Sequence, residues 1–287
     1  MIPTDPARMT RGTWLNVALL VVVAALATIV AFKPRDDAPP SERISSVRAD
    51  RVRDIRLERK GDLPIHLERR TTGWHITAPL AARADPFQVE RLLAVLDAQA
   101  IQRLPARDLA RYGLDDPLTR IVFDGTEIRY GSINAVTREQ YLLSGNAVQV
   151  VAARYGALIP ANLTQLLRKA LFDAGEAPVR LEFSNFTVSE DGKGWRIEPP
   201  LRETPSQDDL NRWIDDWRQA SALRVEPYAG DGAIDTMRVA FRSGKVLALD
   251  VIQKQPELIL GRADQKLRYY FAAPVSARLL SPPGAAH

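Results

Sequence analysis

The sequence predicts an α+β protein in which one N-terminal transmembrane helix precedes two tandem, similar, mainly antiparallel sheet-plus-helix domains. Residues Leu15–Phe32 form an uncharged apolar run of eighteen residues. Two segments 121 positions apart, Gly73–Ile76 (GWHI) and Gly194–Ile197 (GWRI), share an apolar and aromatic framework. Short stretches of alternating apolar and polar residues surround each segment and are typical of antiparallel strands. A framework that recurs at a fixed spacing indicates a repeated structural unit.

The apolar run Leu15–Phe32 is long enough to cross a bilayer, because eighteen helical residues extend over about 27 Å of a ~30 Å hydrocarbon core. Basic residues flank the run on both sides, so the positive-inside rule does not choose its orientation. The short arm of residues 1–14 favours a signal anchor, with the arm in the cytoplasm and the bulk of the chain in the periplasm. The alternative is a signal peptide cleaved after Ala25-Leu26-Ala27, but the apolar run continues past that site.

Composition narrows the classes of function. A chain of 287 residues with 46% hydrophobic residues can form two packed domains. The 39 basic and 35 acidic residues are interleaved, so no basic patch for nucleic acid is expected. The absence of cysteine excludes disulfides, thiolate nucleophiles and cysteine-ligated metals.

The first repeat is expected over residues 51–154, after a polar tether of residues 33–50. Alternation predicts three short antiparallel strands at its start: Val52–Leu57, Ile65–Glu68 and Trp74–Ile76. Asp85 is a good N-cap for the helix that follows, with Pro86 at the first helical position. Apolar residues at helical spacing then form one stripe, namely Val89, Leu92, Leu93, Leu96 and Ala100.

The second half of this repeat is expected to consist of hairpins. Gly113 is suited to closing a short helical turn in the left-handed conformation. Asp124-Gly125 lies between two alternating runs, which is a strong hairpin signal. Gly145-Asn146 predicts a further turn between the runs around Tyr141 and Val148.

A linking helix is expected over residues 155–176, because Leu163, Leu166, Leu167, Ala170 and Leu171 recur at helical spacing. The second repeat is expected over residues 177–280, with its helix at Asp208–Ala222 capped by Ser206, and residues 281–287 form a flexible tail.

The two repeats share apolar positions rather than chemical groups. The helix stripe Val89, Leu92, Leu93 and Leu96 matches Leu210, Trp213, Ile214 and Trp217. Beyond this helix the nearest matches pair Gly131 with Gly261 and Tyr141 with Tyr270, which are more than 121 positions apart. The second repeat is therefore expected to have extra residues, around 243–255. At matching positions of the two repeats, His75 and Thr77 of the first are replaced by Arg196 and Glu198 in the second, so a catalytic site present in both copies is not expected.

The pattern resembles a bacterial family catalogued as domain of unknown function 4340, taken as two tandem copies. The resemblance rests on Gly73–Ile76 with Pro79, the helix start at Asp85, Tyr112-Gly113-Leu114 with Pro117, and the segment from Gly131 to Tyr141. It implies a membrane-anchored envelope protein with an accessory role near an ABC-type export system. It supplies no catalytic residues.

Sites of chemistry are weakly supported. His66 and His75 with Glu68 lack the three or four ligands that zinc needs. The adjacent acids Asp115-Asp116, Asp208-Asp209 and Asp215-Asp216 do not face one another across a cleft. Motifs of serine hydrolases and of phosphate-binding loops are absent from the sequence. Trp213 and Trp217 could form an exposed aromatic platform, but their helical stripe favours burial.

The sequence therefore predicts a non-catalytic, membrane-anchored periplasmic accessory or scaffold protein that serves an ABC-type envelope export system. It would bind a protein partner in the groove between the domains or at an exposed sheet edge. The candidate contact residues, on a predicted late hairpin, are Arg129, Tyr130, Arg138 and Tyr141. A periplasmic binding module for a glycan, lipid or peptide is the alternative, and an envelope hydrolase is third. No catalytic residue, metal or cofactor is expected.

Overall fold

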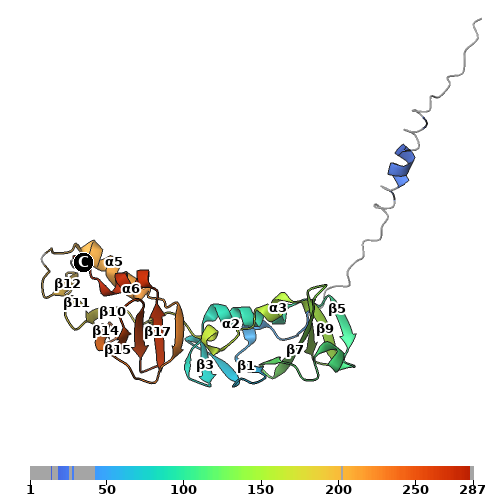
Figure 1. Cartoon of the computed structure of the whole chain (residues 1–287), viewed down its shortest axis with the longest axis horizontal. Helices are drawn as coiled ribbons and strands as arrows, with labels where there is room; N and C mark the ends of the chain where they lie inside the picture. The colour runs from blue at the N-terminus through green and yellow to red at the C-terminus, as the bar shows by residue number, and fades with distance from the viewer. Residues whose placement is uncertain (1–13, 15–18, 26–27, 29–42, 202, 285–287) are drawn as a thin grey trace, which may run out of the picture. The chain divides into compact units, whose positions relative to one another are not determined.

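The computed structural model describes residue 14, residues 19–25, residue 28, residues 43–201 and residues 203–284 (Figure 1). The chain divides into two compact units, Met1–Glu42 and Arg43–His287. In the first unit, residue 14, residues 19–25 and residue 28 are helical. No helix within the described residues is both long and apolar enough to cross a membrane. Most of the predicted span Leu15–Phe32 lies outside the described residues.

The second unit begins with an antiparallel sheet in the order β4-β3-β2-β1-β6-β7-β8-β9-β5. Its strands are β1 (Asp54–Arg59), β2 (Ile65–Arg70), β3 (Gly73–Ala78), β4 (Ala82–Arg83), β5 (Gln102–Pro105), β6 (Thr119–Phe123), β7 (Thr126–Asn134), β8 (Glu139–Ser144) and β9 (Ala147–Ala152). The three predicted strands at the start of this repeat are confirmed as β1, β2 and β3. The predicted hairpin is confirmed too, since Asp124 and Gly125 both have positive φ and join β6 to β7.

A second antiparallel sheet follows in the order β12-β11-β10-β14-β15-β16-β17-β13. Its strands are β10 (Pro178–Glu182), β11 (Thr187–Glu190), β12 (Trp195–Glu198), β13 (Arg224–Pro227), β14 (Asp235–Phe241), β15 (Val246–Gln253), β16 (Leu258–Arg262) and β17 (Leu267–Phe271). Counted along the chain, this order is that of the first sheet without β4. The predicted α+β class with two mainly antiparallel sheets is confirmed.

The strand order corrects the predicted register of the later strands. Gly131 lies in β7 and Gly261 in β16, although β16 is the counterpart of β8. Likewise, Tyr141 lies in β8 and Tyr270 in β17, although β17 is the counterpart of β9. Residues 243–255 contain β15, which is the counterpart of β7. Matching residue types misled the prediction, because strand register follows from hydrogen-bonded pairing and from the buried face.

One helix covers one face of each sheet. The helix α2 (Pro86–Leu93) is capped by Asp85, whose carboxylate accepts hydrogen bonds from the backbone of Phe87 and Gln88, and a 3₁₀ turn, η2 (Ala94–Asp97), continues it. The helix α5 (Gln207–Arg218) is capped by Ser206 and buries the predicted stripe of Leu210, Trp213, Ile214 and Trp217. Both predicted caps are confirmed, because each side chain satisfies backbone N–H groups that a helix start leaves unpaired.

The remaining short helices are η1 (Ala49–Arg51), η3 (Leu109–Tyr112), α3 (Arg154–Ala157), α4 (Leu163–Leu166) and α6 (Ala273–Leu280). In η3, Gly113 closes the turn at φ 68°, as predicted. The predicted linking helix over residues 155–176 is wrong, because only the short helices α3 and α4 form there. Beyond α4, Leu167 forms a β-bridge with Ala84 and Ala170 forms one with Ser221. An extended chain finds backbone partners at Ala84 and Ser221, next to the two sheets, which outweighs the helical spacing of its leucines.

Buried apolar residues of the two sheets form one continuous core. Leu171 and Phe172, in the extended linking segment, belong to this core, and the Phe172 ring contacts Phe241 edge-on at 5.3 Å. The linking segment is therefore part of the packing that joins the sheets.

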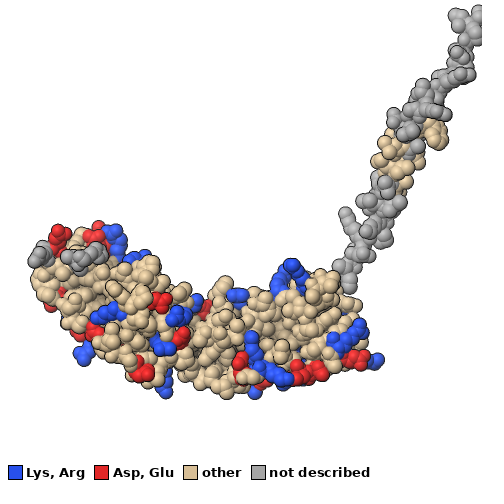
Figure 2. All heavy atoms as spheres, in the orientation of Figure 1, with Lys and Arg blue, Asp and Glu red and all other residues tan. Residues whose placement is uncertain are grey.

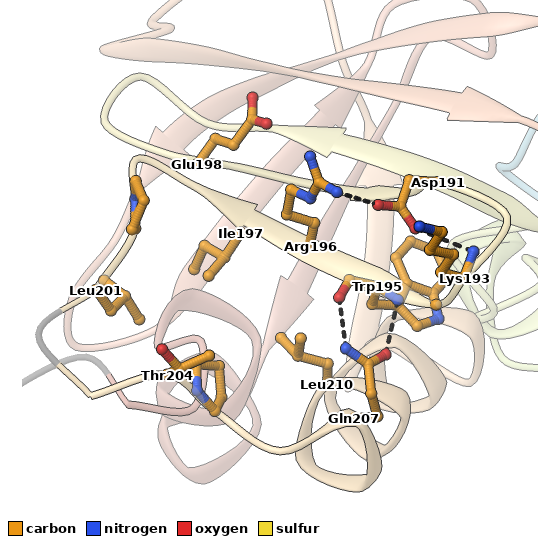
Figure 3. Close-up of a pocket in the computed structure, with 13 residues that line it drawn as sticks. Asp191, Lys193, Trp195, Arg196, Ile197, Glu198, Leu201, Thr204, Gln207 and Leu210 are labelled. Atoms are coloured by element: carbon orange, nitrogen blue, oxygen red, sulfur yellow. Dashed lines mark hydrogen bonds and ion pairs between the residues drawn. The ribbon is translucent and has the colours of Figure 1, made fainter.

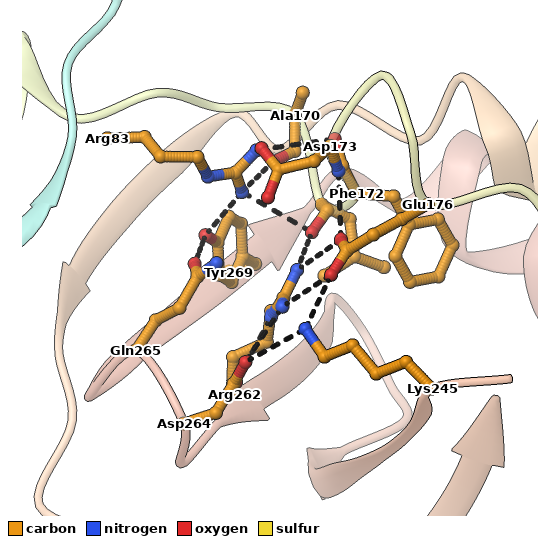
Figure 4. Close-up of polar contacts among 11 residues, drawn as sticks. Arg83, Ala170, Phe172, Asp173, Glu176, Lys245, Arg262, Asp264, Gln265 and Tyr269 are labelled. Atoms are coloured by element: carbon orange, nitrogen blue, oxygen red, sulfur yellow. Dashed lines mark hydrogen bonds and ion pairs between the residues drawn. The ribbon is translucent and has the colours of Figure 1, made fainter. Parts of the chain in front are cut away.

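Two arginines bind the linking segment to the sheets (Figure 4). Arg83, in β4, donates to the carboxylate of Asp173 at 2.6 Å and to the carbonyl of Ala170 at 2.9 Å. Arg262, in β16, has no exposed surface and donates to the carbonyl of Leu171 at 2.6 Å and to Glu176 at 3.0 Å. Buried guanidinium groups are stable in a protein only when carbonyls and carboxylates satisfy their N–H groups in this way.

Glu176 is the main counter-ion at this junction. Burial raises the pKa of its carboxyl, but hydrogen bonds from Arg262 and Lys245 outweigh burial and hold the pKa at about 2. The Lys245 ammonium lies 2.8 Å from the other carboxylate oxygen. Because the pKa in the folded protein is below the ordinary 4.5, ionised Glu176 stabilises the fold above that pH.

We predict that Glu176→Gln lowers the free energy of unfolding by on the order of 3 kcal/mol at pH 7, from the size of the pKa shift. Urea denaturation of the variant and the parent measures this difference. The difference should shrink as the pH falls from 4.5 towards 2, because the parent then loses the same charge. The exposed Glu90→Gln variant is the control and should change stability little at any pH. A difference for Glu176→Gln that stays constant with pH would contradict the prediction.

Candidate partner-binding site at the edge of the second sheet

The strand β12 ends the second sheet without the cover that its counterpart has. In the first sheet, β4 runs along the outer edge of β3, where Ala82 pairs with Ile76 and the Ala84 amide donates to the Trp74 carbonyl at 2.9 Å. Among the described residues, β12 pairs with β11 on one side and with no strand on the other. An uncovered edge presents backbone groups to which another extended chain can bind.

Gln207 covers one residue of this edge. Its side-chain oxygen accepts from the Trp195 amide and its side-chain nitrogen donates to the Trp195 carbonyl, both at 2.8 Å (Figure 3). The carboxamide thus makes the two bonds that a neighbouring strand residue would make. Outward-facing backbone groups belong to alternate residues of a strand, so those of Ile197 come next along the edge.

A pocket of about 690 Å³ lies beside β12. The apolar part of its wall comes from the strand, the loop after it and α5, and comprises Trp195, Ile197, Pro200, Leu201, Pro205 and Leu210. Lys193 and Arg196 lie in the same wall as Asp191 and Glu198, so charges of both signs surround the opening (Figure 3). Arg196 forms an ion pair with Asp191. Apolar walls beside uncovered backbone suit an extended peptide.

The four predicted contact residues do not converge. Arg129 and Tyr141 lie on the outer face of β7 and β8, where Arg129 pairs with Glu127 and Tyr141 packs on Tyr112 at 4.8 Å between ring centroids. Arg138 is exposed in the turn between these strands. Tyr130 points to the opposite, buried face and is 4% exposed. Arg129, Arg138 and Tyr141 stay predictions as contact residues, whereas Tyr130 can reach only a ligand that enters the interior.

The histidines do not form a metal site among the described residues. His75 lies opposite Glu68 and His66 opposite Ala78, so the two histidines are not paired across β2 and β3. Nowhere in the described residues could a group of three or more His, Cys, Asp or Glu side chains hold a metal. His287 lies outside the described residues.

One acid of each adjacent pair is engaged in local structure. Asp116 pairs with Lys60, Asp209 with Arg212 and Asp215 with Arg218. The pKa of Asp209 is lowered, first by its hydrogen bond from Ser206 and then by Arg212. These contacts are those of helix capping and surface ion pairing.

Trp213 and Trp217 do not form a surface platform. They are 4% and 0% exposed, and their indole N–H groups donate to the carbonyls of Arg278 and Leu279 in α6. Their burial confirms the prediction that this stripe belongs to the core. It removes the aromatic surface on which one version of the ligand-binding alternative depended.

The surface charge is mixed. On the face shown in Figure 2, basic and acidic side chains are interspersed among uncharged ones over both sheets. This distribution agrees with the interleaved charges of the sequence.

Residues 74–229, more than half of the 287 residues, match the family model described as Domain of unknown function (DUF4340). The chain belongs to this family. The matched region begins in β3, ends just after β13 and includes β12 and its pocket. No curated protein matches the chain, and no solved structure does.

We predict that Gln207→Ala lowers the free energy of unfolding by about 0.5–1.5 kcal/mol, because two hydrogen bonds to the Trp195 backbone are lost and water can replace them at this edge. Thermal denaturation of the full chain measures the loss. The exposed Gln219 at the end of the same helix provides the control, Gln219→Ala. Equal effects of the two substitutions would show that the Gln207 carboxamide does not cover the edge.

Proposed function

We propose that this DUF4340 protein is a non-catalytic, membrane-anchored accessory or scaffold protein of the bacterial envelope, which binds an extended segment of a partner protein along β12. The observation that carries the proposal is the uncovered edge of β12 beside a pocket of about 690 Å³. Strand addition derives affinity from backbone hydrogen bonds and specificity from side-chain pockets.

The first sheet indicates which segment would fit. There the counterpart edge is covered by β4 and the residue after it, and the small side chains of Ala82 and Ala84 are both buried. A partner segment with small apolar residues at alternate positions would place them against Ile197 and the apolar wall of the pocket. The carboxamide of Gln207 limits pairing at Trp195, which protects the edge from indiscriminate association.

The edge is a better candidate than the groove between the domains. The charged groups that join the sheets already form ion pairs with one another, since Arg83 binds Asp173 and Arg262 binds Glu176 and Asp264, although the Arg83 Nε atom has no hydrogen-bond partner within the described residues. A partner in that region would have to break these contacts before it gained any of its own.

The anchor and the location complete the proposal. The run Leu15–Phe32 would hold the protein in the bacterial inner membrane as a single-pass signal anchor, with residues 33–50 as a tether and the sheets in the periplasm. The shared strand order supports two tandem copies of one unit. We further propose an ABC-type export system as the complex that it serves.

Two other functions rank below this one. A binding module for a glycan, lipid or peptide no longer has an aromatic surface at Trp213 and Trp217 to support it. An envelope hydrolase is third, because the β12 pocket contains no histidine, and Thr204 is its sole hydroxyl side chain among the described residues.

We predict that tagged full-length protein, cross-linked and purified from solubilised membranes, recovers a membrane-complex component that Leu201→Asp fails to recover. The carboxylate would place a desolvated charge in the apolar wall against which the partner packs, with an expected loss of at least about tenfold in recovery. Mass spectrometry of the cross-linked material measures it.

Leu223→Asp is the matched control, because Leu223 is 58% exposed and lies away from the pocket lining. It should leave recovery unchanged. Equal recovery with both variants would exclude β12 as the binding edge. Recovery of no membrane component by the parent protein would contradict the accessory function itself.

A further inference from the structure

The two sheets differ in the helix that follows their last long strand. In the second sheet, α6 follows β17 and provides the carbonyls that Trp213 and Trp217 bind. In the first sheet, α3 occupies the same place after β9, but it ends at Ala157 after a single turn. The face of the first sheet beneath this short helix is therefore less completely covered.

Hydrogen-bond register identifies the residues that lie beneath the two helices. Tyr130 pairs with Thr119, the first residue of β6, and with Leu142. Val251 pairs with Asp235, the first residue of β14, and with Leu260. Tyr130 thus occupies the position of Val251. Two residues before Leu142 and Leu260, Gln140 occupies the position of Leu258 on the same face.

At these two positions the second sheet is apolar and the first is polar. Val251 and Leu258 are buried, and the Leu258 amide donates a hydrogen bond to the Ser276 hydroxyl in α6. Tyr130 and Gln140 are equally buried, at 4% and 6% exposed. Within the described residues, the Tyr130 hydroxyl and the Gln140 side-chain oxygen have no hydrogen-bond partner. Burying such groups unpaired is costly, so each requires an explanation.

Both side chains line a pocket of about 890 Å³ between the end of the first sheet and the segment that begins with α3. Most of the rest of the wall is apolar or lacks a side chain, including Leu118, Ile133, Ala157, Ile159 and Gly156. The Gln140 nitrogen donates to the Gly131 carbonyl at 3.2 Å, which leaves the oxygen as the acceptor without a partner. Pockets of this kind, apolar with a few polar groups, are the usual form of small-molecule sites.

We propose that this pocket binds a neutral amphiphile, a short hydrocarbon chain with a hydroxyl or primary amide head. The head donates a hydrogen bond to the Gln140 side-chain oxygen and accepts one from the Tyr130 hydroxyl, while the chain packs against Leu118, Ile133 and Ile159. This inference is independent of the partner edge at β12, because it rests on a different sheet and on different residues.

The ligand head must donate a hydrogen bond, because the Gln140 side-chain oxygen, which lacks a partner within the described residues, can only accept one. The two arginines of the wall already contact uncharged groups. Arg59 donates to the carbonyl of Pro160 at 2.8 Å, and Arg154 lies over the Tyr155 ring at 5.1 Å. Burial raises the pKa of the Tyr130 hydroxyl, which stays protonated and able to donate. A carboxylate placed against the Gln140 oxygen would lose its hydration and could not donate a hydrogen bond to that oxygen.

Gly156 sets the position of the Gln140 carboxamide. A β-carbon built on Gly156 would lie 2.2 Å from the Gln140 side-chain oxygen, so a larger residue must displace that carboxamide. The absence of a side chain at this point of α3 therefore keeps the acceptor in place. Gly156→Ala tests the acceptor without removing it.

Hexanamide, which is small and water-soluble, serves as the probe. The full-length protein, labelled with 3-fluorotyrosine and held in lipid nanodiscs, is titrated while ¹⁹F NMR follows the Tyr130 resonance, assigned by its loss in Tyr130→Phe. The proposal predicts a saturable shift of this resonance. Hexanoate, which is charged, and methyl hexanoate, which cannot donate, should bind at least about tenfold more weakly, the ratio expected for one lost hydrogen bond.

Three variants separate recognition from folding. Gln140→Leu and Gly156→Ala should each weaken hexanamide binding at least about tenfold. Gln140→Leu should keep the fold, because leucine is accommodated at the equivalent position Leu258. Tyr141→Phe, on the same strand as Gln140 but on its outer face, is the matched control and should bind as the parent does.

Two results would overturn the proposal. The first is the absence of a saturable Tyr130 shift with hexanamide. The second is equal binding of hexanamide and methyl hexanoate together with unchanged affinity in Gln140→Leu, which would show a cavity that admits apolar molecules without reading their head group. Either result would leave the β12 edge unaffected, since recovery of a partner there is measured separately.

Discussion

An antiparallel sheet with one face in water must bury its other face under apolar residues, and both halves of this protein depend on that constraint. Each half meets it with one helix, α2 or α5, whose apolar stripe packs on the sheet. In the second half the stripe includes two tryptophans that also bond to α6, so three elements close the core there. Both sheets have the same strand order apart from β4, so both halves bury their apolar face with the same arrangement of strands.

The candidate sites lie where the two halves meet the constraint differently. Along the outer edge, β4 covers β3 in the first sheet, while the second sheet leaves β12 with the single cap of Gln207. Over the buried face, α6 covers the second sheet, while the shorter α3 leaves a pocket over Tyr130 and Gln140 in the first. The first half covers its sheet edge but leaves a pocket over its buried face, whereas the second half covers its buried face but leaves its sheet edge unpaired. This difference favours two different binding sites over one site shared by both halves.

The junction between the halves is built to stay closed. Arg262 is fully buried and bonds to the linking segment and to two carboxylates, while Arg83 bonds to the same segment from the first sheet. Removing either charge from such a network leaves buried partners unsatisfied, which destabilises the junction. Both sheets therefore hold the extended linking segment through hydrogen bonds from an arginine.

The sequence by itself determined the elements whose signals are local. Asp85 and Ser206 cap their helices, Asp124-Gly125 turns its hairpin and the Leu92 and Trp213 stripes are buried, because capping, turn geometry and helical spacing depend on neighbouring residues. Only the tertiary structure decided the rest. The Leu163–Leu171 spacing predicts a helix, but beyond Leu166 the chain is extended and bridges to Ala84 and Ser221. The edge of β12 and the burial of Tyr130 depend on which strands and helices lie next to them, and that proximity involves residues far apart in the chain.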